Sequence, residues 1–167
     1  MNAGDELVDL LDADGATIGV VTRHTMRAQR LPHRCCYILV FDTQGDLLIH
    51  LRTPSKDVYP AHWDVCVGGV VAAGETFDEA ALREVEEETG VAAPLEALFP
   101  FRFADEATAV HGLVYRAVHD GPFHWQPEEI VRGEFLPLPR VLERAQQVPF
   151  CPDGLAVLAR YRAWSED

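Results

Sequence analysis

The chain has 167 residues, of which 48% are hydrophobic and 25% charged, so it is long and apolar enough to fold as one domain around its own core. Its formal net charge of -13 argues against a partner that is held mainly by phosphate attraction, such as duplex nucleic acid. The charge does not exclude a small anionic substrate, because a bound cation can reverse the sign of the local field.

The beginning of the chain and its cysteines predict a cytoplasmic protein with no membrane partner. The segment MNAGDELVDLLDADG has acids where a signal peptide would have basic residues, and no apolar run approaches the roughly 18 residues of a membrane helix. None of the cysteines shows C-x-x-C spacing, so we expect free thiols in a reducing compartment. They are Cys35, Cys36, Cys66 and Cys151.

Two β-hairpins are predicted in the first third of the chain. Apolar runs at residues 7–11 and 17–22 flank an Asp-Gly turn, which is typical of a hairpin. A polar, arginine-containing segment follows at residues 23–34. Apolar runs at residues 35–41 and 47–51 then flank the polar stretch DTQGD, and the first run is apolar enough for a strand buried on both faces.

The next elements alternate between strands and helices without a regular βαβ order. A loop with two prolines at residues 54–60 precedes a strand-like run at residues 63–71, which Gly68 and Gly69 interrupt. Beyond the central helix the pattern predicts strands near residues 95–103, 110–118 and 130–136, and helices over residues 138–147 and 153–164. This order predicts a mixed sheet with helices packed on it.

The strongest helical signal covers residues 76–89. Thr76, followed three residues later by Glu79, predicts a capping box at its start. Gly90 stands where a left-handed C-cap residue is expected. On a helical wheel one side is apolar and consists of Ala81, Leu82 and Val85.

Four glutamates fall within five consecutive positions of this helix: Glu84, Glu86, Glu87 and Glu88. The wheel brings Glu84, Glu87 and Glu88 together and turns the fourth toward solvent, although like charges three and four residues apart repel one another. Arg83 is spaced to relieve this repulsion through contacts with Glu79 and Glu87. A solvated acidic face would explain most such helices, but three converging carboxylates are also what a hard divalent cation such as Mg²⁺ requires.

The pattern around these glutamates resembles the Nudix box. Residues 69–91, GVVAAGETFDEAALREVEEETGV, match G-x5-E-x7-R-E-U-x-E-E-x-G-U, where U is apolar. The matching residues are Gly69, Glu75, Arg83, Glu84, Val85, Glu87, Glu88, Gly90 and Val91. The resemblance implies a single Nudix hydrolase domain over residues 1–167. Its expected fold is an α/β/α sandwich with a mixed β-sheet and an N-terminal β-hairpin over about residues 6–22.

The resemblance implies Mg²⁺, or Mn²⁺ in its place, as the cofactor for hydrolysis of a diphosphate linkage. Carried over by position, the expected metal ligands are Gly69 through its carbonyl, Glu84, Glu87 and Glu88. Arg83 resembles the residue that orients the carboxylates. The loop and the end of the helix are expected to depend on Glu75 and Gly90.

The same resemblance leaves the general base open. Glu87 and Glu88 are the first candidates, because a carboxylate beside the cation can accept the proton of the attacking water. Glu129, in the run QPEEIVRGEF, is a further candidate, since the family often has a glutamate in a later loop that faces the site. An exposed acidic loop is an equally weighted explanation for Glu129.

The segments before the box, including MRAQRLPHR and RTPSKDVYPAHWDVCVGG, resemble the isopentenyl-diphosphate-isomerase-like branch of the superfamily. The isomerases have a catalytic cysteine directly before the box glycine, where this chain has Gly68, and a histidine directly after it, where this chain has Val70. Cys66 lies two residues too early to replace the missing thiol without a register shift. These departures predict a hydrolase with an isomerase-like body.

Three basic positions match that branch. Arg52 and Lys56 resemble its pair of substrate-diphosphate contacts, and ordinary strand-end charges are the alternative. His33 resembles a metal-ligand histidine, although a structural role is the stronger expectation for it.

The group attached to the diphosphate is selected by no motif. Four aromatic side chains could stack a base, although their sheet-like spacing is more typical of core residues: Trp63, Phe101, Phe103 and Trp125. We expect a nucleoside diphosphate, a nucleoside triphosphate or a nucleoside diphosphate derivative as the small-molecule substrate. The rivals are an isomerase acting on a prenyl diphosphate and a nucleotide-binding module without activity. A homodimer is compatible with the resemblance.

Overall fold

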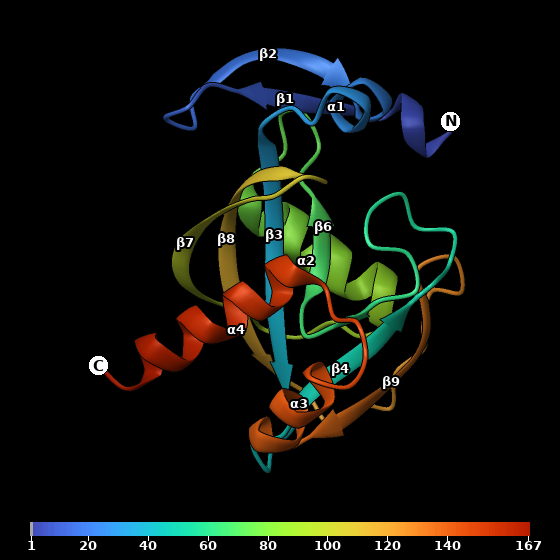
Figure 1. Ribbon diagram of the computed structural model, residues 1–167, viewed down its shortest axis with the longest axis vertical. Helices are drawn as coiled ribbons and strands as arrows, with labels where there is room; N and C mark the ends of the chain where they lie inside the picture. Colours follow the sequence, from blue (N-terminus) through green and yellow to red (C-terminus); the bar gives the residue numbers. More distant parts are fainter. Residues whose placement is uncertain (1) are drawn as a thin grey trace.

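The computed structural model describes residues 2–167 of the chain (Figure 1). The strands are β1 (Leu7–Leu11), β2 (Thr17–Thr22), β3 (His33–Phe41), β4 (Leu47–Arg52), β5 (Trp63–Asp64), β6 (Val67–Val70), β7 (Glu96–Ala104), β8 (Ala109–Val118) and β9 (Ile130–Leu136). The helices are the 3-10 helix η1 (Ala3–Asp5), α1 (Arg23–Gln29), α2 (Phe77–Thr89), α3 (Leu138–Ala145) and α4 (Pro152–Ser165). Within this part of the chain, the helices are too short or too polar to span a lipid bilayer.

β3 is the centre of the larger sheet. It pairs in parallel with β8 along its whole length and antiparallel with β6 through residues 35–38, within the strand order β5-β4-β3-β8-β7. Its side chains alternate between two cores, as expected for a strand buried on both faces. Cys35, Tyr37, Leu39 and Phe41 face one core, and Cys36, Ile38 and Val40 face the other.

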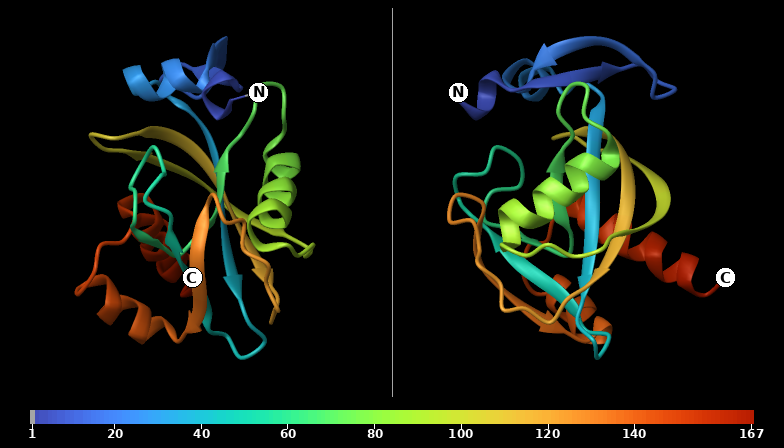
Figure 2. Two further views of the ribbon diagram at one scale, coloured as in Figure 1. Left: turned by 90° about the vertical axis from the view of Figure 1, so that its right-hand side faces the viewer. Right: turned by 180° about the vertical axis from the view of Figure 1, so that it is seen from behind.

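Helices cover both faces of this sheet, which confirms the expected α/β/α sandwich. α2 packs on one face through Ala80, Ala81 and Val85, while Val141 of α3 and Val157 of α4 belong to the core of the opposite face. The edge-on view in Figure 2 shows the sheet between α2 on one side and α3 and α4 on the other. The four cysteines are buried and free, as predicted.

The N-terminal hairpin is confirmed, but the segment after it was predicted incompletely. β1 and β2 pair antiparallel as a separate two-stranded sheet across one end of the larger sheet (Figure 1). Residues 23–34 contain α1, which begins at the N-cap Thr22, whose hydroxyl accepts a hydrogen bond from the backbone N–H of Thr25 at 3.1 Å. The helix ends at Arg30 in the left-handed conformation with φ of 52°. The apolar period was too short over these seven residues to predict it.

Two strand predictions need correction. The predicted second hairpin is not a continuous strand pair, since β3 and β4 pair only at Phe41 and Leu47. The rest of β4 pairs with β5 and β9. The run at residues 63–71 breaks after Asp64 rather than at the glycine pair, which lies inside β6. Both differences arise because the edge of β3 is occupied by β6, which a local pattern does not reveal. The later strands and helices lie close to their predicted ranges.

The predicted caps of α2 are confirmed, but the prediction that Leu82 belongs to its buried apolar face was wrong. The Thr76 hydroxyl accepts from the Glu79 backbone N–H at 3.1 Å, and Gly90 ends the helix with φ of 74°. Leu82 is 53% exposed, whereas Glu88 is 6% exposed. The buried face is centred on Ala81 and passes through Glu88 two turns later, so the carboxylates border the core instead of standing opposite it.

Candidate active site

The glycine pair of β6 lets this strand lie close to β3 on one side and to α2 on the other. Gly68 has φ of 146°, and a Cβ atom there would lie 2.1 Å from the carbonyl oxygen of Cys36. A Cβ atom on Gly69 would lie 2.9 Å from Oε1 of Glu84. The absence of a side chain at Gly68 therefore lets β6 lie against β3, and its absence at Gly69 lets a carboxylate of α2 lie directly against the strand backbone.

Arg83 organises the acidic cluster. Its guanidinium binds Glu75 through two hydrogen bonds of 2.8 and 2.9 Å, and it contacts Glu84 at 2.9 Å and Glu87 at 3.2 Å. Glu75 also accepts from the Ala72 backbone N–H at 3.0 Å, which ties the loop before α2 to this network. The role expected for Arg83 as the residue that orients carboxylates agrees with these contacts.

One predicted partner of Arg83 was wrong. Glu79 does not contact Arg83, because its carboxylate accepts from the Thr76 hydroxyl at 3.0 Å in the capping box. Glu75 takes its place through the two-pronged contact, which matches the planar geometry of guanidinium and carboxylate. Sequence spacing alone favours the i,i+4 pair, whereas the loop fold brings Glu75 within reach.

Two of the cluster's carboxyl groups are largely removed from solvent: Glu84 shares Arg83 with Glu75 and Glu87, and Glu88 has no ion pair within residues 2–167. Burial raises the pKa of Glu84 to about 6, although Arg83 acts in the opposite direction. Burial and then the neighbouring Glu84 raise the pKa of Glu88 well above its usual range. The Glu88 carboxylate accepts a hydrogen bond from the Gly68 backbone N–H at 3.3 Å. Negative charge at these two positions is therefore costly unless another cation compensates it.

The types of donor atom in the cluster fit a hard divalent cation, although the side chains do not stand in a ligating conformation. Carboxylate oxygens and the Gly69 carbonyl are ligands that Mg²⁺ prefers. Within residues 2–167, however, no three His, Cys, Asp or Glu side chains stand in a ligating arrangement. Arg83 draws Glu84 and Glu87 toward itself, while Glu88 lies against Gly68. Ligation would therefore require rotation of the Glu84 and Glu87 side chains.

Glu129 faces the cluster from the segment before β9. It borders the same depression as Arg83, Glu84 and Glu87, and its carboxylate pairs with the ammonium group of Lys56. The structure thus brings this glutamate to the box and does not leave it as an isolated loop acid.

The two basic residues that were expected to bind substrate lie beside the box glycines. Arg52, Lys56, Gly68 and Gly69 all line a cavity of about 80 Å³. The Arg52 guanidinium donates to the Val58 carbonyl at 2.8 Å, and it also lies 3.9 Å from Asp64, while Lys56 pairs with Glu129 as described above. Both cations are thus placed at the cavity, where each already has partners.

His33 has a structural position. It is buried at the start of β3, where its Nδ1 lies 2.8 Å from the carbonyl oxygen of Leu31, and burial lowers its pKa to about 4. This neutral imidazole agrees with the structural role that we expected.

The aromatic residues considered for base stacking belong to packed clusters. Trp63 stacks on Phe150, Phe101 packs edge-on against Tyr37, and Phe103 stacks on Phe101. Trp125 stacks on Phe123, and both pack beside the core on the α2 side. The core assignment therefore explains all four.

Sequence reasoning missed four charged residues of this region. Arg23 and Arg27 of α1 line the cavity, as do Asp64 and Asp153. The i,i+4 spacing of the two arginines within the polar segment at residues 23–34 was the signal that could have found them. The acids had no such signal, because burial raises the pKa of Asp64 to about 7 only once α4 packs over it.

Comparisons with known proteins show what the chain as a whole is similar to. The model of the NUDIX domain matches residues 31–153. The chain is 40% identical over 167 residues to "Uncharacterized Nudix hydrolase SCO1686" of Streptomyces coelicolor, a match that covers 98% of this chain and 92% of that protein. It is 38% identical to "Uncharacterized Nudix hydrolase YfcD" of Escherichia coli (strain K12), with 94% and 87% covered. The crystal structure of DR0079 from Deinococcus radiodurans has a TM-score of 0.82 and 32% identity, and covers 93% of this chain and 98% of that chain.

Proposed function

The chain belongs to the Nudix hydrolase family, and from this premise we propose that it cleaves the diphosphate linkage of nucleoside diphosphates, nucleoside triphosphates or nucleoside diphosphate derivatives with Mg²⁺. Mn²⁺ is the alternative ion. The observation that supports this proposal most directly is the network in which Arg83 joins Glu75, Glu84 and Glu87 beside Gly69. Two carboxyl groups of this cluster are costly to the metal-free fold, since burial raises the pKa of Glu84 and of Glu88.

We assign the metal ligands to Glu84, Glu87, Glu88 and the Gly69 carbonyl. A cation held there would neutralise phosphate oxygens and lower the pKa of a bound water. Arg83 orients the carboxylates through its hydrogen bonds.

The proton of the attacking water is assigned to a carboxylate of the cluster. Glu87 and Glu88 are the first candidates for this general base, and Glu129 is the further candidate because it lines the same depression as Glu87. Glu75 holds the loop and Gly90 ends the helix, so both have supporting roles.

Arg52 and Lys56 are proposed to contact the substrate diphosphate from the cavity wall. Their present partners would have to release them in part, and Lys56 would be freed if Glu129 turned toward the cluster.

We further propose one domain over residues 1–167, a cytoplasmic location, no membrane or duplex nucleic-acid partner, and a homodimer as the assembly to test first.

The direct experiment is product analysis on a substrate panel. Nucleoside diphosphates, nucleoside triphosphates, sugar nucleotides, coenzyme A and dinucleoside polyphosphates would each be incubated with the protein and Mg²⁺. The expected products are a nucleoside monophosphate with phosphate or pyrophosphate from nucleoside di- and triphosphates, and two phosphorylated fragments from compounds in which the diphosphate joins two groups. Chelation of the cation should abolish their release. Binding of a nucleotide with Mg²⁺ but no product from any compound would instead establish a binding module.

An isomerase is disfavoured by the conformation of Gly68. The position where the isomerases carry their cysteine has φ of 146° here, and any Cβ atom would meet the Cys36 carbonyl at 2.1 Å. Cys66 is buried, and burial raises its pKa well above the usual value, so it is not an activated thiol. Incubation with isopentenyl diphosphate should therefore yield no isomer, and formation of dimethylallyl diphosphate would reverse this assignment.

Divalent cations should stabilise the folded chain. A cation that binds the folded state alone raises the free energy of unfolding, because it compensates the buried charge of Glu84 and Glu88. We expect the melting temperature to rise on addition of Mg²⁺ or Mn²⁺. The double variant Glu84→Gln with Glu88→Gln should abolish this rise in differential scanning fluorimetry, and an unchanged rise would place the ion elsewhere.

A further inference from the structure

Several basic residues of this acidic chain line the same cavity. Four of its 14 lysines and arginines line the cavity beside the box glycines: Arg23, Arg27, Arg52 and Lys56. Arg52 and Lys56 come from β4 and the loop after it, whereas Arg23 and Arg27 come from α1. A chain with a net charge of -13 has thus placed cations from two separate segments around one opening.

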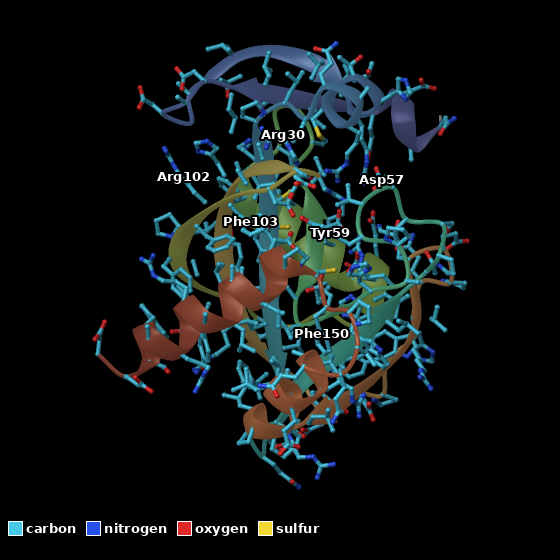
Figure 3. The ribbon with its side chains drawn as sticks, in the orientation of Figure 1. Arg30, Asp57, Tyr59, Arg102, Phe103 and Phe150 are labelled. Atoms are coloured by element: carbon cyan, nitrogen blue, oxygen red, sulfur yellow. The ribbon has the colours of Figure 1, made fainter. Side chains whose placement is uncertain are left out.

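Arg23 and Arg27 share a single anionic partner. Their Nε atoms lie 3.4 and 3.2 Å from the same oxygen, Oδ2 of Asp57, which is on the loop between β4 and β5 below α1 (Figure 3). Arg27 also donates to the Thr108 hydroxyl at 3.4 Å, and Arg23 lies 3.6 Å from Glu6. Burial alone would raise the pKa of Asp57, yet Arg27 and Arg23 hold it below its ordinary value. One carboxylate oxygen is therefore a poor match for two guanidinium forks.

A phosphate group matches this pair better than a carboxylate does. It carries more negative charge and enough oxygens to give each guanidinium its own acceptors, and arginine is well suited to bind it in two-pronged fashion. The side chains of Arg23 and Arg27 are each 20% exposed, whereas that of Asp57 is 41% exposed. The two arginine side chains are thus partly buried at the cavity, and the side chain of Asp57 is the more exposed member of the group.

Arg23 also connects the cavity to the acidic cluster. It borders the depression that contains Arg83, Glu84, Glu87 and Glu129 as well as the cavity that contains the box glycines. A ligand whose one phosphate is held at the cluster would therefore extend its next anionic group toward α1. Because the family model begins at residue 31, α1 lies outside the part of the chain that it describes.

We propose that Arg23 and Arg27 bind the substrate phosphate that lies away from the acidic cluster, and that Asp57 occupies this anion site until the phosphate displaces it. The identity of the ligand as a diphosphate rests on the proposed function. The residues themselves are specificity determinants that the N-terminal segment adds to the hydrolase domain. Substrates that end in a second phosphate would thereby be preferred over monoesters.

Binding of inorganic pyrophosphate to metal-free protein tests the site without turnover. Isothermal titration calorimetry would compare wild type with Arg23→Gln, Arg27→Gln, Asp57→Asn and the control Arg140→Gln. Arg140 is an exposed arginine of α3 that pairs only within its own helix, with Glu143. Loss of one charge-assisted contact should weaken pyrophosphate binding about tenfold or more in Arg23→Gln and in Arg27→Gln, with no change in the control.

Asp57→Asn should act in the opposite direction and tighten pyrophosphate binding, since it removes the competing anion while it keeps both arginines. A misfolded variant would not bind pyrophosphate more tightly. Tighter binding by Asp57→Asn would therefore show that the arginine site itself, and not the folding of the variants, is being measured. Undiminished binding by both arginine variants, or no gain in Asp57→Asn, would overturn the proposal. Failure of the substrate panel to yield product leaves this binding result unaffected, so the two proposals fail separately.

Discussion

Glu88→Gln should lower kcat/KM for the best substrate of the panel by about 100-fold or more. The amide keeps the size of the side chain but loses the charge that a cation needs and the basicity that a proton acceptor needs. The variant should stay folded, because burial raises the pKa of Glu88 and makes its ionised form unfavourable in the metal-free protein. We therefore expect lost activity together with an unchanged or higher melting temperature without metal.

Glu86→Gln is the matched control for this prediction. Glu86 is an exposed glutamate of the same helix, it differs from Glu88 by half a turn, and it has no part in the Arg83 network. Steady-state kinetics at saturating Mg²⁺ should show near-normal turnover for this control. Full activity in Glu88→Gln would remove Glu88 from both the metal and the base assignments, and Glu87→Gln and Glu129→Gln would then be compared to find the base.

Gly68→Ala should be the most destabilising of the single substitutions considered for this chain. A Cβ atom at this position would lie 2.1 Å from the Cys36 carbonyl oxygen, and φ of 146° is a conformation that only glycine adopts readily. Because both obstacles are backbone features of the central sheet, relaxation is costly. We expect a loss of about 3 kcal/mol or more in the free energy of unfolding, measured by urea denaturation.

Gly19→Ala provides the comparison on another strand. No heavy atom lies within 4 Å of a Cβ atom at Gly19, and its φ is outside the left-handed region. Its free energy of unfolding should therefore change by less than about 0.5 kcal/mol. A Gly68→Ala protein as stable as Gly19→Ala would show that β6 can move away from β3, and would reopen position 68 to the isomerase cysteine.

Local patterns in the sequence were sufficient for several parts of the molecule. The Asp-Gly turn of the N-terminal hairpin, the capping box at Thr76 and the C-cap at Gly90 all depend on residues close together in the chain, so they could be predicted. The spacing of the box also predicted the neighbours Arg83, Glu84 and Glu87, because one helix carries all of them.

Other features were decided only when distant segments met. The packing of α2 on β6 determined that Glu88 is buried and Leu82 exposed, since the wheel alone does not say which stripe faces the sheet. Likewise, the loop before α2 selected Glu75 over Glu79 as the partner of Arg83. The first outcome depends on how closely the helix approaches the strand, and Gly69 in a different element permits that approach.

By itself the sequence determined the chemistry of the box: which carboxylates share a helix, where that helix starts and ends, and which family the chain belongs to. Tertiary structure alone decided what surrounds the box, including the cavity with arginines from α1 and the carboxylate of Glu129. The reason is physical, because helix caps and i,i+4 neighbours are set by short-range geometry. Burial, pKa and shared cavities arise only when segments far apart in sequence pack together.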